Sequence, residues 1–488
     1  MHMEKSDTLA VLFVTSEISP FIKTGGLADV SASLPAALQQ LGVDIRVLTP
    51  AYPSLLEALP TTHSHDNLFL SSIGTNVGII KAIHPTLDIP LYLLDYPPYF
   101  HRTGGPYQDI RGKDWQDNVW RFGLLGEAAA AIGCFQLPHQ FAPAIVHCND
   151  WQTGLAPAYL HFCKKPHASS LMTIHNLAFQ GNFPPLILPR LDLPWEAYNL
   201  NGLEFFGHVS FMKAGLQYSD AITTVSPTYA QEIQTEELGF GFNGLLHERR
   251  EALTGILNGI HETEWDPARD PFLEHHYSRD NLANKSKCKQ ALKKKLGLDS
   301  QNSPLIGVVS RMTYQKGLDL FIEIAPLLIS SGAQLAILGN GEAPLENQFR
   351  DLASRFPGKI ALRIGFDEAL AHQITAGADL FVMPSRYEPC GLNQMYSQHY
   401  GTPPIVHATG GLADTVADFR KNPSKATGFM FHEPTSQALL TSVKLALNCY
   451  QQQASWHKII KQGMKQDFSW KRNAQQYIEV YNRINVSR

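Results

Sequence analysis

A glycine turn next to a lysine is the first feature of this 488-residue chain that could do chemistry. In KTGGLAD, residues 23–29, Gly25 and Gly26 allow a ligand to approach the backbone closely. The N–H groups of a following helix, together with Lys23, would attract an anion such as phosphate. The segment lacks the full pattern of a P-loop or of G-x-G-x-x-G. Taken alone, it fits an ordinary tight turn with a surface lysine better than a phosphate site.

Two cations follow a second apolar run, in the segment SRMTYQKGLD. Arg311 and Lys316 are five residues apart at the end of a predicted strand, where they could converge on a diphosphate. A guanidinium can bind two oxygens at once, and an ammonium adds a compact charge. A loop held by ordinary salt bridges is the alternative.

A third turn lies in PSRYEPCGLNQMYSQHYG, residues 384–401. Pro389 turns the chain before a predicted helix, whose first backbone N–H groups would point at an anion. These N–H groups belong to Gly391, Leu392 and Asn393. Glu388, just outside the helix, could bind sugar hydroxyls. Cys390 is expected to pack as a buried thiol, because the sequence places no histidine to activate it.

Asp150 and His175 each close a predicted strand, in HCNDWQTGL and TIHNLAFQG. A strand end can aim such a side chain at a ligand, although a lone Asp or His there is more often a structural cap. No H-E-x-x-H pattern or other metal-ligand spacing accompanies them, so no metal site is expected.

The elements that must hold these turns are predicted by apolar runs in two regions, the second beginning near residue 303. Both regions show the strand–helix–strand order of an α/β fold, and continuous apolar runs indicate parallel strands buried on both faces. The segment TGGLADV at 24–30 recurs as TGGLADTV at 409–416. We therefore expect two similar units whose glycine loops face a shared cleft, because ligands of open parallel sheets sit beyond the carboxyl ends of the strands.

The composition argues against several classes of protein. A net charge of −4 and a pI of about 6.6 give no sign of a nucleic-acid partner or an anionic membrane. The N-terminus reads as a first strand, not as a signal peptide, and no apolar stretch is long enough for a membrane helix. Six cysteines without a C-x-x-C pair indicate neither zinc nor a disulfide framework. We expect a cytoplasmic protein with reduced thiols, whose lysine-rich segment 262–302 contains a solvated helix.

Together, these motifs resemble the bacterial glycogen synthases and plant starch synthases, family 5 of the retaining glycosyltransferases. The resemblance covers nearly the whole chain, in the family's order of motifs, and also includes PYQDIRGKDWQDNVWRF, FMKAGLQYSDAITTVSPTYAQEI and ILNGI. It implies an α/β GT-B fold, in which two Rossmann-like domains with parallel sheets face a central cleft. The expected domains are 1–258 on the acceptor side, 259–468 for the nucleotide sugar, and a helix at 469–488 that packs back on the first domain.

The resemblance implies retaining transfer of glucose from ADP-glucose to the non-reducing 4-OH end of an α-1,4-glucan, either glycogen or a maltooligosaccharide. No cofactor is implied. Catalytic roles are expected for His175, Asp150, Arg311, Lys316 and Glu388. Substrate contacts are expected from Lys23, Gly25, Gly26, Asn258, Cys390, Gly391, Leu392, Asn393, Thr409, Gly410 and Gly411.

The chain departs from the family's pattern at some positions. His261 stands where Asp usually follows "NGI", and Phe366 stands where relatives often have Tyr. Tyr396 stands where the wider GT-B superfamily often has a second Glu, which leaves the ribose contacts unassigned.

Other functions stay open from the sequence alone. One is a different GT-B sugar transferase, such as a sucrose- or trehalose-forming enzyme, and another is a two-domain sugar-binding protein without catalysis. The clustering of Arg311, Lys316 and Glu388 argues against the second. A nicotinamide dehydrogenase is weaker still, because no G-x-G-x-x-G follows the first strand. The residues do not decide between ADP and UDP donors, nor the glucan length or the oligomeric state.

Overall fold

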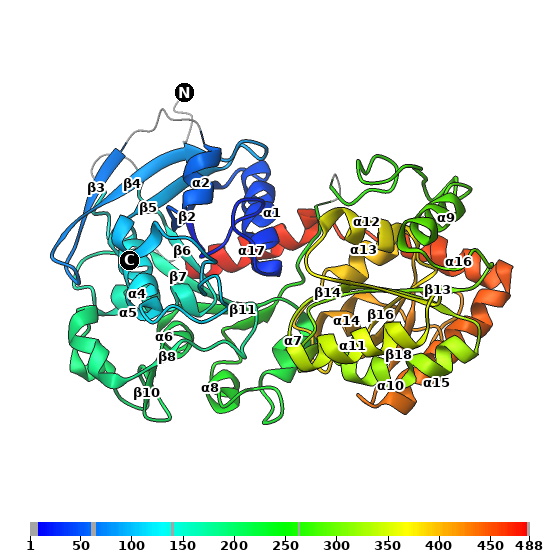
Figure 1. Cartoon of the computed structure of the whole chain (residues 1–488). Coiled ribbons are helices and arrows are strands. Elements are labelled where there is room, and N and C mark those ends of the chain that lie inside the picture. The colour runs from blue at the N-terminus through cyan, green and yellow to red at the C-terminus, as the bar shows by residue number, and fades with distance from the viewer. Residues whose placement is uncertain (1–7, 60–64, 138–140, 262–263, 486–488) are drawn as a thin grey trace. The chain divides into compact units, whose positions relative to one another are not determined.

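The structure, a computed structural model, describes residues 8–59, 65–137, 141–261 and 264–485. The chain forms two compact units (Figure 1). Unit 1 comprises Met1–Gly259 with Trp470–Arg488, and unit 2 comprises Ile260–Ser469. Among the described residues, no helix has the length and apolar character needed to cross a membrane.

Unit 1 is built on a nine-stranded sheet with the order β12-β11-β7-β6-β1-β2-β5-β4-β3. Its parallel strands are β1 (Ala10–Val14), β2 (Asp44–Pro50), β5 (Pro90–Asp95), β6 (Ile145–Asn149), β7 (Ser169–Ile174), β11 (Ala221–Thr224) and β12 (Leu253–Gly255). At one edge, β3 (His65–Leu70) and β4 (Thr75–Ile83) form an antiparallel hairpin. The apolar-run criterion misses this hairpin, because β3 is largely exposed and only its alternate leucines are buried.

The remaining elements of unit 1 surround this sheet. Its α-helices are α1 (Gly26–Gln40), α2 (Pro53–Ala58), α3 (Pro97–Phe100), α4 (Asn118–Gly133), α5 (Leu155–Phe162), α6 (Phe211–Tyr218), α7 (Pro227–Glu232), α8 (Asn243–Glu248) and α17 (Trp470–Ile484). A small antiparallel sheet joins β8 (Asn182–Phe183), β10 (His208–Ser210) and β9 (Glu204–Phe205). Short 3-10 turns are η1 (Trp151–Thr153), η2 (Pro185–Leu191) and η3 (Trp195–Ala197).

The last helix, α17, belongs to unit 1 although 210 residues of unit 2 precede it in the chain. Figure 1 shows α17, in red, beside α1, in blue. The Tyr481 hydroxyl lies 2.8 Å from Nδ1 of the buried His147 on β6. The Ser169 hydroxyl donates to the Ile484 carbonyl at 2.7 Å. Polar side chains of the sheet are thus satisfied by this helix, which fixes its place against the strands.

Unit 2 contains a six-stranded parallel sheet with the order β15-β14-β13-β16-β17-β18. The strands are β13 (Leu305–Val309), β14 (Gln334–Gly339), β15 (Ile360–Ile364), β16 (Leu380–Met383), β17 (Pro404–His407) and β18 (Phe429–Phe431). The helices are α9 (Lys285–Leu296), α10 (Leu318–Ser330), α11 (Ala343–Arg355), α12 (Glu368–Gly377), α13 (Asn393–His399), α14 (Gly410–Thr415), α15 (Ser436–Gln451) and α16 (Gln453–Gly463), with one 3-10 turn, η4 (Tyr314–Lys316).

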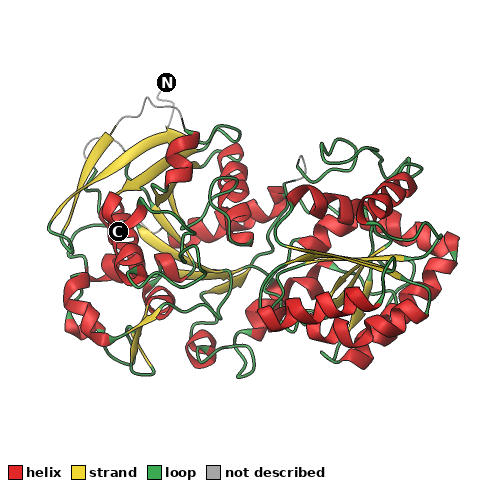
Figure 2. Ribbon diagram, in the orientation of Figure 1, coloured by secondary structure: helices red, strands yellow, loops and turns green. Residues whose placement is uncertain are grey.

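Alternate residues of the central strands of unit 2 pack on opposite faces. On β14, Leu335 and Ile337 join a cluster with apolar residues of α10, α11 and α15, whereas Ala336 and Leu338 join one with residues of α9 and α12. This period of two follows from the pleat of a strand. Figure 2 shows red helices on both sides of the yellow sheet of this unit. Burial on both faces explains why the strands read as continuous apolar runs.

Helix α9 carries the lysines of the segment 262–302, and several of them are structural. The Lys285 ammonium donates to the carbonyls of Ala376 and Tyr400, and Lys289 forms an ion pair of 2.5 Å with Asp379. Lys293 is buried and donates to the Gln301 carbonyl. The expectation of a solvated helix is therefore wrong for these three lysines, because their ammonium groups satisfy carbonyls and a carboxylate that the fold leaves open.

Candidate functional site

In each unit, the strand order reverses at a point that carries the predicted residues. In unit 1, β1 pairs with β2 on one side and with β6 on the other. In unit 2, β13 pairs with β14 on one side and with β16 on the other. Ligands of open α/β sheets bind beyond the carboxyl ends of strands at such reversals. The loops after β1, β6, β13 and β16 carry Lys23, Asp150, Lys316 and Glu388, respectively.

The glycine loop after β1 is held by a buried carboxylate that the sequence analysis did not single out. Glu17 is only 3% exposed, and it accepts hydrogen bonds from the Thr24 amide and hydroxyl, both at 2.6 Å. The Tyr107 hydroxyl donates to the same carboxylate at 2.6 Å. The motif PYQDIRGKDWQDNVWRF thus reaches the loop through its tyrosine, and Glu17 holds the loop at Thr24.

The loop itself is open at its glycine. A methyl group added at Gly25 would find no atom within 4 Å, so the backbone there can be approached closely. The Lys23 ammonium forms an ion pair of 2.9 Å with Asp29 in the first turn of α1. Gly26 is the first residue of that helix. The loop thus consists of an open glycine turn before a helix, and its lysine is paired with a carboxylate of the same motif.

Asp150 and His175 are brought together by the parallel pairing of β6 and β7. The Asp150 carboxylate accepts hydrogen bonds from the His175 amide at 2.7 Å and the Asn176 amide at 3.3 Å. The His175 ring lies 2.9 Å, through Nε2, from the Asn149 side-chain oxygen. Asp150 adopts a φ of +55°, which a residue with a side chain seldom does. Strain of this kind gathers at functional sites.

The charge states of this pair follow from burial. Burial raises the pKa of Asp150 to about 7, although the two backbone N–H donors oppose the shift. Burial lowers the pKa of His175 to about 3, so its imidazole is neutral near pH 7. A neutral imidazole can donate or accept a hydrogen bond but adds no positive charge.

Asn258 lies in unit 1, close to its boundary at Gly259. Its side chain is buried, and its Oδ1 atom has no hydrogen-bond partner among the described residues. A methyl group at Gly259 would overlap the ring and backbone of Trp470, so the chain is held tightly here. Leaving a buried acceptor without a partner costs free energy, which makes the Asn258 oxygen a candidate for a ligand contact.

In unit 2, Lys316 and Glu388 form a direct ion pair. The ammonium lies 2.8 and 2.6 Å from the two carboxylate oxygens, and the Ser385 hydroxyl donates to Glu388 at 2.8 Å. Gly317, with a φ of +62°, follows Lys316, and a methyl group there would overlap the Pro384 carbonyl. Glycine thus allows η4 to pack against the end of β16, which brings the ammonium to the carboxylate.

Arg311 remains exposed at the end of β13. Within the part of the chain that the structure describes, its guanidinium makes no hydrogen bond or ion pair. The structure therefore places a paired cation, Lys316, and an unpaired one, Arg311, in the same loop.

The second glycine motif, residues 409–416, packs against the turn 388–393. Methyl groups at Gly410 and Gly411 would overlap the carbonyl oxygens of Glu388 and Cys390, respectively. The Gly411 amide donates to the Glu388 carbonyl at 3.2 Å. The two glycine motifs thus differ, since the space beside Gly25 is open, whereas the neighbouring turn occupies the space beside Gly410 and Gly411. Thr409 is the N-cap residue of α14 and is buried.

The remaining predicted residues of this turn take well-defined positions. Gly391 has a φ of +71°, and Cys390 is buried. Leu392 precedes α13, which begins at Asn393, and the Asn393 amide group donates to the Val309 carbonyl at 2.9 Å. The side chain of Asn393 thereby ties the turn to the end of β13.

Two of the departures from the family's pattern acquire a structural meaning. Tyr396 stacks on Trp265 with ring centroids 3.9 Å apart, so it serves packing within unit 2. Phe366 is 78% exposed, between β15 and α12. An exposed ring at the end of a strand offers an apolar surface on which a planar base can stack.

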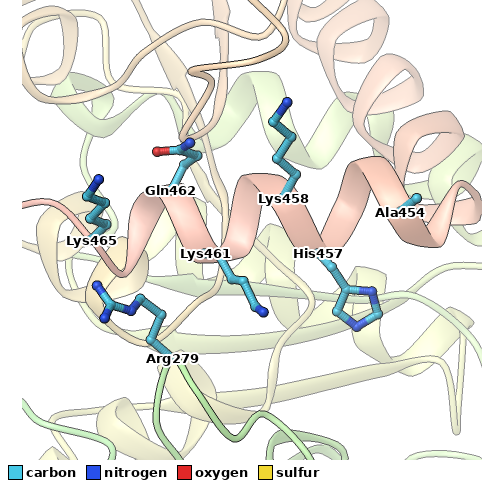
Figure 3. A pocket seen from close by; sticks show the side chains of 7 residues that line it. All are labelled: Arg279, Ala454, His457, Lys458, Lys461, Gln462 and Lys465. Atoms are coloured by element: carbon cyan, nitrogen blue, oxygen red, sulfur yellow. The ribbon is translucent and has the colours of Figure 1, made fainter.

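An open hollow of about 660 Å³ lies along α16, outside the predicted residues. It is lined by Arg279, Ala454, His457, Lys458, Lys461, Gln462 and Lys465. In Figure 3, Lys458 and Lys465 point to one side of the helix, whereas His457 and Lys461 point to the other. The charges do not converge on one ligand position. Within the described residues there is also no cluster of His, Cys, Asp and Glu suited to a metal ion.

Sequence profiles of known families match both units. The starch synthase catalytic domain matches residues 10–248, and the glycosyl transferases group 1 profile matches residues 289–463. Among solved structures, the catalytic domain of starch synthase IV from Arabidopsis thaliana, bound to ADP and acarbose, superposes with a TM-score of 0.89 at 31% identity. That alignment covers 98% of this chain and 99% of the other. The prediction of a GT-B α/β fold is confirmed by this likeness.

Curated relatives resemble the chain over its length. A glycogen synthase of Nitrosomonas eutropha is 50% identical over 481 residues, which cover 97% of this chain and 96% of the relative. A glycogen synthase of Nitrosospira multiformis is 50% identical over 480 residues, covering 97% of each. A sucrose-phosphate synthase from Thermosynechococcus elongatus, at 16% identity and a TM-score of 0.61, shares the fold alone. The chain belongs to the family of glycogen and starch synthases, as its motifs predict.

Proposed function

We propose that the chain transfers glucose from ADP-glucose to the non-reducing 4-OH of an α-1,4-glucan, with retention of the anomeric configuration. The observation that carries the proposal is the Lys316–Glu388 pair at the strand reversal of unit 2, in a chain of this family. The ADP bound to starch synthase IV supports ADP as the nucleotide product here.

Unit 2 supplies the groups for the donor in this proposal. Arg311 and Lys316 hold the diphosphate, and Glu388 orients Lys316 and accepts hydrogen bonds from glucose hydroxyls. Cys390, Gly391, Leu392 and Asn393 surround the glucosyl unit, and the motif that contains Thr409, Gly410 and Gly411 keeps their turn in shape. Phe366 offers its exposed ring to the base.

Unit 1 supplies groups for the reacting sugar. Lys23, Gly25 and Gly26 approach the donor, and Glu17 holds their loop through Thr24. Neutral His175 donates or accepts a hydrogen bond near the anomeric carbon, while Asp150 fixes the backbone on which His175 sits. The buried side-chain oxygen of Asn258 contacts the donor.

The mechanism that fits these groups is a front-side displacement. The bond from the anomeric carbon to the diphosphate breaks as the 4-OH of the acceptor attacks from the same face, and the departing diphosphate takes the proton of that hydroxyl. The guanidinium of Arg311 and the ammonium of Lys316 spread the charge of the leaving group, an effect worth about 3–4 kcal/mol per well-placed donor. A glycosidase-like route would need two carboxylates about 5–5.5 Å apart around the bond.

A donor comparison tests the proposal. Purified protein receives ADP-glucose or UDP-glucose with glycogen, and polymer-bound glucose is measured against nucleotide released. We expect incorporation from ADP-glucose with equal release of ADP. Parallel reactions with fructose 6-phosphate or glucose 6-phosphate in place of glycogen test for a sucrose- or trehalose-forming enzyme. Transfer only to those acceptors, or binding of sugar without nucleotide release, would contradict the proposal.

A further inference from the structure

Two thiols outside the proposed site lie in contact in unit 1. Cys134 follows the end of α4, and Cys163 follows the end of α5. Both are free cysteines, and their Sγ atoms are 2.9 Å apart. A disulfide bond measures about 2.0 Å, so the two sulfurs need to approach by only about 0.9 Å to bond.

The backbone holds these thiols in place. A methyl group at Gly133 would press on Val146 of β6 and on Leu160 of α5, so this glycine lets the end of α4 pack closely against both. The Ala168 amide donates to the Gly133 carbonyl at 2.9 Å. The end of α4 is therefore tied to the segment that follows Cys163, and the contact between the sulfurs is a consequence of packing.

We propose that Cys134 and Cys163 form a reversible disulfide when the folded protein meets a low-molecular-weight disulfide such as glutathione disulfide. The Cys163 thiolate attacks one sulfur of the oxidant, which forms a mixed disulfide and releases one glutathione. The Cys134 thiolate then attacks Cys163 Sγ and releases the second glutathione. Two protein thiols are oxidised, one external disulfide is reduced, and the two protons of the cysteines end on the released thiols.

The order of these steps follows from exposure. Cys163 is the more accessible of the two, whereas Cys134 is buried. Burial, with a further contribution from the Cys163 contact, raises the pKa of the Cys134 thiol to about 12, while Lys165 favours its thiolate. Cys163 therefore supplies the first thiolate, and Cys134 resolves the mixed disulfide at a distance already close to bonding.

Thermodynamic linkage gives a quantitative test. A disulfide that stabilises a fold is itself favoured by that fold to the same degree, and a typical stabilisation corresponds to roughly 30-fold or more. Full-length protein is equilibrated in glutathione redox buffers, with and without 8 M urea, quenched by alkylation and mapped by mass spectrometry. We expect a 134–163 cross-linked peptide, with an equilibrium constant at least roughly 30-fold larger in the folded protein.

Two variants serve as controls. C163S should lose the cross-link, and the rise in melting temperature that oxidation gives the wild type should vanish. C449S removes a buried thiol in unit 2 and should keep both effects. The proposal is overturned if folded protein shows no 134–163 peptide, if Cys163 stops as a stable glutathione adduct, or if urea leaves the equilibrium constant unchanged.

Discussion

At the scale of single residues, the ion pair of Lys316 and Glu388 is expected to contribute both to catalysis and to stability, and substitutions can separate the two effects. Replacing Lys316 by Met should lower kcat by ~10²-fold, because the leaving diphosphate loses a charged donor. It should also lower the free energy of unfolding by about 1–3 kcal/mol, because Glu388 then lies buried without its partner. The double variant K316M/E388Q should regain stability but not activity.

Steady-state kinetics and urea unfolding measure both effects of this exchange. K458M, which removes an exposed lysine of α16 in the same unit, is the matched control and should leave both unchanged. Wild-type turnover in K316M would show that Lys316 does not stabilise the leaving diphosphate.

The raised pKa of Asp150 predicts that the free energy of unfolding depends on pH. Its pKa in the folded protein is raised to about 7, so the folded state holds the proton more tightly than the unfolded chain. This contribution to the free energy of unfolding is complete below pH ~4 and is lost as the pH rises through 7. The stability of D150N relative to wild type should therefore increase by roughly 2–3 kcal/mol between pH 5 and pH 8.

Urea unfolding of both proteins at each pH measures this difference. D280N, at an exposed carboxylate, should show no such trend. A constant difference between D150N and wild type would mean that Asp150 is ionised throughout this range.

The positions of individual candidate residues could be predicted where a motif carries them, but the residues that hold them in place could not. A motif at the end of one predicted strand carries Asp150, and a motif at the end of another carries His175. The parallel pairing of these two strands brings the residues together. Glu17 was missed, because its role depends on Tyr107, 90 residues away. Ser385 was missed for a similar reason, since a serine near a glutamate carries no signal until the turn is folded.

At the scale of elements, Gly317 determines how the turn η4 packs against β16. An alanine there should be markedly more destabilising than at Gly297, although both glycines have a φ near +65°. At Gly297 the added methyl group meets open space, and only backbone strain of about 1–2 kcal/mol remains. At Gly317 it overlaps the Pro384 carbonyl and displaces Lys316. Unfolding curves of G317A and G297A, with their kcat values, compare the two, and equal costs would contradict this account.

The two related glycine motifs should respond to substitution in opposite ways. Gly25 has an extended backbone and open surroundings, so G25A should keep its stability within about 0.5 kcal/mol. Its kcat/KM for ADP-glucose should fall by about 10-fold or more, because the donor can no longer approach closely. G411A should instead lose stability, because the methyl group overlaps the Cys390 carbonyl. A wild-type kcat/KM in G25A would show that the first motif does not contact the donor closely.

The sequence predicted the elements whose signal is local. Buried parallel strands such as β1 and β13 read as apolar runs because helices cover both of their faces. The β3–β4 hairpin lies at an edge, where alternation with exposed residues weakens that signal. Lys285, Lys289 and Lys293 of α9 look solvated in the sequence, because their carbonyl and carboxylate partners lie at least eight residues away and mostly on other elements.

At the scale of the whole molecule, each unit repeats one arrangement: a sheet built mainly of parallel strands, a reversal of strand order, and loops with the candidate residues beyond the carboxyl ends. The likeness to glycogen synthases extends over 97% of the chain, so both units belong to the family's catalytic architecture. The proposed chemistry needs groups from each unit, which makes the product of the complete chain the decisive observation.

The most direct test of the central claim is proton NMR of the polymer made from ADP-glucose and a short maltooligosaccharide by the full-length protein. The account predicts new α-1,4-linked residues at the non-reducing end, one for each ADP released, and almost none with K316M. A β-linked product, glucose released into water without chain growth, or equal synthesis by K316M would contradict it.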